Sequence, residues 1–167
     1  TLLPVSFPPL NHTATTLTYA AKATRSPAVA VPSGGELTVA HQLDGPNGRS
    51  ISDCASTPSA SWYFPGGTTV TGADMWLALF NPFPGDATVD VAFDTTDGAR
   101  TPQDYQGAVV PSRSVKVLKV SEKVVHDLNV ATTVSVRSGR IVAEMIQSDN
   151  GREDERLPKG LTAITGA

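Results

Sequence analysis

Apolar and polar residues alternate with a period of two in a series of short segments between Trp62 and Gln147. Val89, Val91 and Phe93, for example, alternate with smaller or polar residues. Because successive side chains of a strand point to opposite faces, this pattern predicts strands that each bury one face. The predicted strands lie at 62–64, 75–80, 87–93, 107–110, 115–120, 130–137 and 141–147.

Turn-forming residues separate these segments at nearly even intervals. Asp97-Gly98 predicts a hairpin turn, and Arg137-Ser138-Gly139-Arg140 predicts a tight two-residue hairpin with Gly139 at positive φ. Many short strands divided by such turns are typical of all-β proteins. We therefore expect an immunoglobulin-like antiparallel β-sandwich over 61–147, preceded by an N-terminal extension of short strands.

The alternation also predicts which side chains fill the core. Trp76 shares one side of an apolar strand with Ala78 and Phe80, which indicates a central core tryptophan of the kind found in sandwiches. Between Val117 and Leu118 the alternation changes phase, so we expect a β-bulge that places Lys116 and Lys119 in water. The predicted core residues are Trp76, Phe80, Val89, Val91, Phe93, Val134 and Val136.

The rest of the chain divides into segments of different composition. Residues 1–27 are rich in Thr, Ala and Pro and are interpreted as a linker or edge segment, with one edge strand near Leu17 to Ala20. Residues 28–60 predict short strands, around a Pro-Ser-Gly-Gly turn, and a loop packing on the main module. Residues 148–167 are interpreted as a charged loop and a linker to a further module, as in a fragment of a longer protein.

Charge and composition exclude several classes of partner. Only 17% of the 167 residues are charged and the formal net charge is −3, so no basic field is available for nucleic acid. No segment reaches the roughly 20 apolar residues that span a bilayer, which argues against direct membrane insertion by this segment. Cys54 is the single cysteine, so it is either free or disulfide-bonded to a cysteine elsewhere.

The sequence offers little for catalysis. His12, His41 and His126 are scattered, without a second ligand at metal spacing, and there is no Gly-x-Ser-x-Gly elbow for a serine nucleophile. The acidic stretch from Asp149 to Arg156 lacks the alternating pattern of a calcium loop and contains two arginines, so we interpret it as a solvated loop. We expect no enzymatic activity, no metal and no cofactor.

The densest aromatic cluster is the candidate contact site. Trp62, Tyr63 and Phe64 are consecutive, and on a strand they cannot all face the core, so at least one ring should be exposed. Stacked rings with a polar neighbour such as Asp74 suit the apolar face and the hydroxyls of a sugar. The alternative interpretation is that these rings pack in the core.

Several spaced motifs carry a family resemblance, namely Cys54-Ala55-Ser56, Trp62-Tyr63-Phe64-Pro65-Gly66-Gly67, Leu77-Ala78-Leu79-Phe80-Asn81-Pro82, 87–93, 106–114 and 137–144. Together, over about residues 50–147, they resemble an actinobacterial envelope family of unknown function. Its members are secreted or membrane-anchored proteins with sandwich-like repeats, encoded beside a multi-spanning family-2 glycosyltransferase. No catalytic residue comes with the resemblance.

Three functional hypotheses follow. The first is a noncatalytic extracytoplasmic interaction or scaffold module, accessory to the membrane glycosyltransferase or another envelope protein that the resemblance implies. The second is a carbohydrate-binding module for envelope polysaccharide. The third, a glycan hydrolase, depends on carboxylates that meet only in space.

Overall fold

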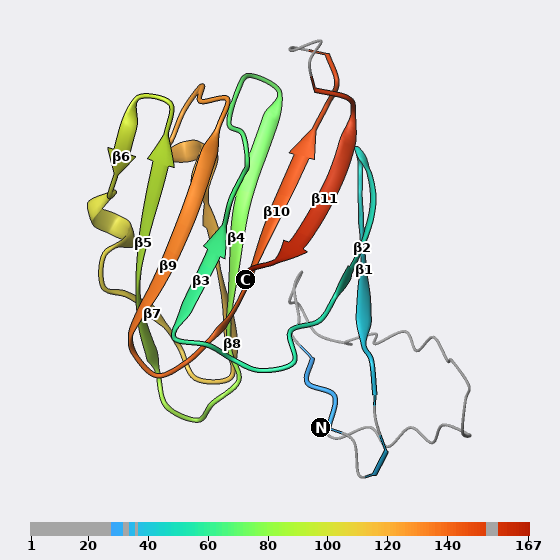
Figure 1. Cartoon of the computed structure of the whole chain (residues 1–167), viewed down its shortest axis with the longest axis vertical. Coiled ribbons are helices and arrows are strands. Elements are labelled where there is room, and N and C mark those ends of the chain that lie inside the picture. Colours follow the sequence, from blue (N-terminus) through green and yellow to red (C-terminus); the bar gives the residue numbers. More distant parts are fainter. Residues whose placement is uncertain (1–27, 32–33, 36, 153–156) are drawn as a thin grey trace.

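The computed structural model describes residues 28–31, 34–35, 37–152 and 157–167, and their strands are all paired antiparallel (Figure 1). One sheet has the order β11 (Gly160–Thr165), β10 (Val142–Asp149), β4 (Ala73–Asn81), β8 (Ser114–Lys119). The second has the order β3 (Ser61–Phe64), β9 (Val130–Ser138), β5 (Ala87–Thr95), β6 (Gly98–Arg100), while β7 (Ala108–Val110) pairs with the other end of β5. The predicted all-β antiparallel sandwich is confirmed.

The core lies between these two sheets. Val89, Val91, Phe93 and Val134 are almost fully buried, in agreement with the alternation of β5 and β9. Val136 is only partly buried and packs against the edge of this core. Burying side chains of this size from both sheets is the main favourable term in the free energy of folding.

The predicted burial of Trp76 and Phe80 is wrong. In β4 the opposite set of residues points inward: Met75, Leu77 and Leu79 are 0% exposed, while Trp76 and Phe80 lie half-buried on the outer face. Both faces of β4 are apolar, so the period-two pattern gives the strand but not the face that meets the second sheet.

The predicted bulge in β8 is also absent. β8 pairs with β4 in continuous register from Ser114 to Lys119, with Leu118 on the core side and Val117 on the outer side. Lys116 lies at the edge of the sheet, where its Nζ donates to the Val109 carbonyl of β7. An edge position lets this lysine reach water without a bulge, because the sheet ends there. The register shift that does occur lies in the pairing of β5 with β9, at Thr88 and Val89.

The four residues from Arg137 to Arg140 do not form the predicted hairpin. β9 and β10 belong to different sheets, so this short turn carries the chain from one sheet to the other. Gly139 has the expected positive φ, +85°. Arg137 pairs with Asp90 on the neighbouring strand β5, with Nε and Oδ2 2.5 Å apart. The predicted hairpin at Asp97-Gly98 is present as β5–β6.

The N-terminal and C-terminal segments also differ from expectation. Residues 28–31 form no strand, and the hairpin instead consists of β1 (Ala40–Gly45) and β2 (Gly48–Asp53), with its tip in the segment predicted to be a loop. The predicted linker at 148–167 contains β11, which completes the four-stranded sheet. Residues 1–27, including the predicted edge strand and His12, lie outside the described residues.

After β11 the chain crosses to the edge of the other sheet (Figure 1). The amide of Ala167 donates to the carbonyl of Tyr63, and the amide of Tyr63 donates to the carbonyl of Ala167. These two bonds pair the outer edge of β3, which would otherwise present free backbone groups. Gly166 lies against the core rings here, since a Cβ on it would be 2.9 Å from Cζ of Phe64.

Candidate functional site

The outer face of the four-stranded sheet carries an apolar surface. Directly paired residues of antiparallel strands point to the same face, so the register places the partners of Trp76, Ala78 and Phe80 beside them on the outside. Two of these partners are charged, Glu144 beside Ala78 and Lys119 beside Trp76. The others are partly buried valines and an isoleucine that form an apolar set with the three residues of β4. We call this set the outer apolar face: Trp76, Ala78, Phe80, Val115, Val117, Val142 and Ile146.

Charged and polar groups border this face beside Trp76. The Nζ of Lys119 lies 5.8 Å from the centroid of the Trp76 ring, within the range of a cation–π contact. The same Nζ is 3.0 Å from Oδ1 of Asp74, which also accepts a hydrogen bond from Ser121 Oγ at 3.1 Å. Asp74 is about half exposed, at 48% of its side chain. The surface therefore offers an aromatic ring next to both a carboxylate and an ammonium group.

The two tryptophans have different environments. Trp62 is 5% exposed, and its indole N–H donates to the carbonyl of Ile141 at 2.9 Å, so both its ring and its polar atom are used inside the protein. Trp76 lies on the outer face, and the described residues form no hydrogen bond with its N–H. An amphipathic ring in such a position is suited to a contact with another molecule.

The predicted aromatic site is mostly structural. Trp62 and Phe64 are buried, and of the three consecutive rings only Tyr63 is exposed, at 54%. Asp74, the predicted polar neighbour, lies on β4 beside Trp76. The structure thus brings Asp74 together with a tryptophan that the sequence assigned to the core. The signal that could have identified Trp76 is the apolar character of both alternating sets of β4.

The β1–β2 hairpin packs along β11 (Figure 1), at the edge of this sheet opposite β8 and on its outer face. Ser50 Oγ accepts a hydrogen bond from the amide of Ala163, and Thr165 Oγ1 donates to the carbonyl of Asp53. Asn47 Nδ2 donates to Ser148 Oγ on β10. The described hairpin contacts are therefore largely polar, in contrast to the apolar contacts that join the two large sheets.

His41 is the centre of a polar cluster under the hairpin. Its Nε2 lies 2.8 Å from Oε1 of Glu144 on β10, and Ser52 Oγ donates to the same carboxylate oxygen at 3.1 Å. On the other side of the ring, Nδ1 lies 3.8 Å from Sγ of Cys54. The scattered histidines of the sequence predicted no such grouping, yet the fold gives His41 a carboxylate partner. Strand alternation places His41 and Cys54 on one face of the hairpin, but Glu144 joins them only through the tertiary fold.

The side chain of Cys54 is exposed, and its surroundings favour the protonated thiol over the thiolate. Partial burial raises the pKa of Cys54, and the negative charges of Glu144 and Asp53 raise it further. Beside this cluster the hairpin and β11 form a shallow depression of about 380 Å³. It is lined by Ile51, Ser52, Asp53, Ala163, Ile164 and Thr165.

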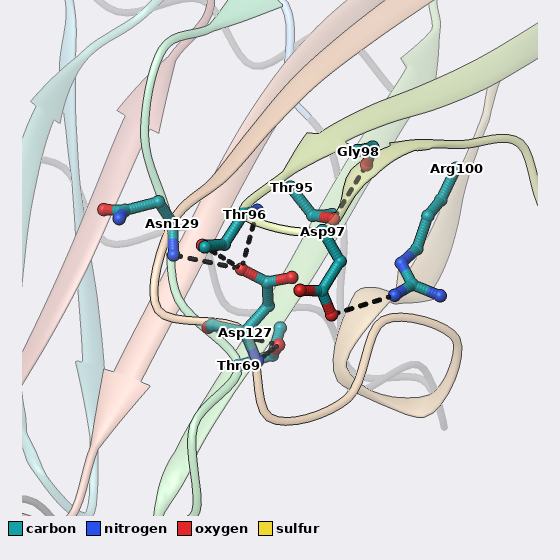
Figure 2. Close-up of polar contacts among 8 residues, drawn as sticks. All are labelled: Thr69, Thr95, Thr96, Asp97, Gly98, Arg100, Asp127 and Asn129. Atoms are coloured by element: carbon teal, nitrogen blue, oxygen red, sulfur yellow. Dashed lines mark hydrogen bonds and ion pairs between the residues drawn. The ribbon is translucent and has the colours of Figure 1, made fainter.

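A buried carboxylate at one end of the sandwich joins three loops (Figure 2). Oδ1 of Asp127 accepts hydrogen bonds from the amide and hydroxyl of Thr96 and from the amide of Asn129. The backbone carbonyl of Asp127 accepts from the amide of Thr69. Burial acts to raise the pKa of Asp127, but the hydrogen bonds from Thr96 and Asn129 outweigh it and leave this pKa below its ordinary value. The carboxylate is therefore a structural connector.

The described residues do not gather a metal centre. Among them, no group of three or more His, Cys, Asp or Glu side chains is arranged to hold a metal ion. Asp149, in the predicted acidic loop, is buried and accepts a hydrogen bond from the amide of Gly151, while residues 153–156 lie outside the described part. His126 contacts Thr71 Oγ1 through Nδ1 at 3.2 Å. No described helix is long and apolar enough to cross a membrane.

The fold defines an antiparallel β-sandwich module that carries partly buried apolar side chains on the outer face of one sheet. The chain matches the family of unknown function DUF5719 over residues 10–163 and belongs to that family. No curated protein matches it. Among solved structures it is similar to the crystal structure of Thermotoga maritima 1070, with a TM-score of 0.55 and 14% identity, covering 66% of this chain and 94% of that one. At this identity the likeness shows the fold alone.

Proposed function

We propose that this chain is a noncatalytic interaction module that binds a protein partner through the outer apolar face. The observation that carries this proposal is the position of Trp76 and Phe80, two large rings that point away from the core onto the outer face of the sheet and remain partly accessible, beside the area where the β1–β2 hairpin reaches Glu144. Contiguous apolar surface of this kind is typical of protein contact sites, where large aromatic side chains contribute most of the binding energy. The residues of this face come from three adjacent strands, so they suit a broad contact with another protein surface.

The resemblance to an envelope family supplies the proposed setting. We place the module outside the cytoplasmic membrane of an actinobacterial cell, where it assists a multi-spanning glycosyltransferase or another envelope protein. In this setting the module contributes a contact surface and no chemistry to the transferase. Sequence motifs over about 50–147 support this proposal, together with the open face on β8, β4 and β10.

The test replaces apolar residues of the outer face by threonine, which keeps strand propensity while it removes the ring of Phe80 and replaces a methyl group of Val117 by a hydroxyl. We expect Phe80→Thr combined with Val117→Thr to lower capture of the glycosyltransferase from native envelope by the tagged protein at least about tenfold, equivalent to roughly 1.4 kcal/mol of binding free energy. Tyr63→Thr is the matched control, because Tyr63 is exposed on the opposite sheet. Equal loss with both variants, or loss with Tyr63→Thr alone, would move the contact surface to β3.

Carbohydrate binding is the second candidate, and the grouping of Trp76 with Asp74 and Lys119 favours it. A sugar can place its apolar face on the ring and its hydroxyls on the carboxylate and the ammonium group. Asp74→Asn keeps the shape of the side chain and removes its charge. Affinity electrophoresis in a gel containing envelope polysaccharide should then show retardation of the parent protein and a loss of retardation in Trp76→Ala. If polysaccharide retards the parent protein and displaces the protein partner, the carbohydrate function replaces the first proposal.

A further inference from the structure

Three side chains from separate segments form a row that links a thiol, an imidazole and a carboxylate. Cys54 Sγ is 3.8 Å from Nδ1 of His41, and Nε2 of the same ring is 2.8 Å from Oε1 of Glu144. The thiol and the carboxylate therefore engage opposite nitrogens of one imidazole. A nucleophile in contact with a base that is itself oriented by a third group is the arrangement that activates nucleophiles in acyl transfer.

The carboxylate fixes which nitrogen carries the proton. Glu144 can only accept a hydrogen bond in its ionised form, so Nε2 of His41 is the protonated nitrogen, and Nδ1 presents its lone pair to the thiol. Ser52 Oγ donates to the same oxygen of Glu144 and holds the carboxylate in place. Glu144 is mostly buried, with 19% of its side chain exposed, and this strengthens its interaction with the ring.

We propose that Cys54 is a covalent acceptor site for acyl groups carried as esters or thioesters, with His41 as general base and Glu144 as the positioning residue for His41. In the step, Nδ1 of His41 takes the proton of the Cys54 thiol while Sγ attacks the acyl carbonyl carbon. A new S–C bond forms, the bond from that carbon to the leaving oxygen or sulfur breaks, and the leaving group takes the proton from Nδ1. The product is a thioester on Cys54, and no external oxidant or reductant is needed.

The surroundings of the thiol fit this role. Cys54 is exposed, so a donor can reach it, and the depression beside it mixes apolar residues such as Ile51 and Ile164 with polar ones. Glu144 and Asp53 are the charged groups near the thiol, and together with partial burial they raise the pKa of Cys54. The thiol is then protonated at neutral pH and depends on His41 for removal of its proton at the moment of attack.

The experiment measures acylation of Cys54 by p-nitrophenyl acetate. The wild-type chain should release one equivalent of p-nitrophenolate rapidly and gain one acetyl group on Cys54, located by peptide mass analysis. His41→Gln preserves a group that can donate to Glu144 but provides no base, so we expect its acylation rate to fall about 100-fold. Glu144→Gln, which keeps a hydrogen-bond partner and removes the charge, should give an intermediate rate. Arg49→Ala, which removes an exposed ion pair with Asp44 on the same hairpin, should leave the rate unchanged.

A pH profile separates base catalysis from a structural effect. Wild-type acylation should already be fast near neutral pH, whereas acylation of His41→Gln should rise only as the thiol ionises at alkaline pH. Circular dichroism shows whether each variant keeps its fold. A wild-type rate no faster than that of His41→Gln, or than that of a short unfolded peptide around Cys54, would overturn the proposal. His41→Gln and Arg49→Ala lie on the hairpin and change no residue of the outer apolar face, so their outcomes are independent of the proposed partner contact. Glu144 lies on that face beside Ala78, so the Glu144→Gln rate is interpreted only together with the rates of these two variants.

Discussion

At the scale of single residues, the two alternating sets of β4 have different energetic roles. Leu77 is fully buried between the sheets, while Trp76 is half-buried outside. Loss of Leu77 leaves a cavity that the two sheets enclose, whereas loss of the Trp76 ring leaves space on the outer face that water can fill, so for folding Leu77 matters more than Trp76. The value of Trp76 lies instead in what its exposed area can contact.

This difference predicts the outcome of two alanine substitutions. Leu77→Ala should lower the free energy of unfolding by about 3–5 kcal/mol, because it leaves a cavity between the sheets. Trp76→Ala should cost less than about 2 kcal/mol, because water already reaches part of the ring and can fill the space left. Urea denaturation followed by circular dichroism measures both. A larger loss for Trp76→Ala than for Leu77→Ala would contradict the assignment of faces.

Asp127 gives a prediction about pH. Its pKa is lower in the folded state than the ordinary value of 3.8, so the unfolded state binds the proton more readily. The stabilisation is therefore complete well above pH 4 and is lost as the pH falls through the folded pKa. Asp127→Asn, which removes the charge and leaves one oxygen acceptor, should lower the free energy of unfolding at pH 7 by about 1–3 kcal/mol. The difference in free energy of unfolding between the parent and Asp127→Asn should become smaller in acid. A difference that stays constant down to pH 2 would show that the charge of Asp127 does not contribute to stability.

At the scale of elements, the crossing from β11 to β3 joins the two sheets at one edge. It requires a small residue, since a Cβ on Gly166 would lie 2.9 Å from Phe64 and 3.0 Å from Trp62. Both rings are buried and cannot move away without disturbing the core. The identity of this glycine is thus set by packing against rings that are far away in the sequence.

Replacing Gly166 by valine tests this connection. We expect Gly166→Val to lower the free energy of unfolding by about 1–3 kcal/mol through overpacking, and to increase hydrogen exchange at the amide of Tyr63, which pairs with Ala167. Gly66→Ala is the control, because nothing lies within 4 Å of the Cβ it would introduce. If Gly166→Val unfolds at the same urea concentration as the parent, the crossing does not depend on close contact with the rings.

At the scale of the whole molecule, the parts are held together by different forces. The two large sheets share an apolar core, whereas the β1–β2 hairpin is attached through Ser50, His41 and Asn47 by polar contacts. Polar contacts at a surface contribute little net stability each, since water competes for them. The sandwich is therefore the stable unit, and the hairpin contributes the thiol and imidazole of the proposed acyl site.

The sequence by itself determined most strands between Trp62 and Gln147, several of their turns and the inner face of β5, but not β1, β2 or β11. That face was readable because only one alternating set, with Val89, Val91 and Phe93, is apolar. The aromatic cluster at 62–64 was also partly readable, since three successive rings on a strand cannot share one face. These features depend on residues that are adjacent in the chain, and local stereochemistry is enough to fix them.

Only the tertiary structure decided which face of β4 is buried, which sheet each strand joins, and which polar groups meet. Both sets of β4 are apolar, so the choice depends on which set the second sheet covers. β9 and β10 follow each other closely in the chain but belong to different sheets. β9 pairs with β3 and β5, whereas β10 pairs with β11 and β4. His41 and Glu144 meet because the hairpin packs along β11, which places β10 within reach. Such contacts join distant parts of the chain, and a period-two pattern holds no information about them.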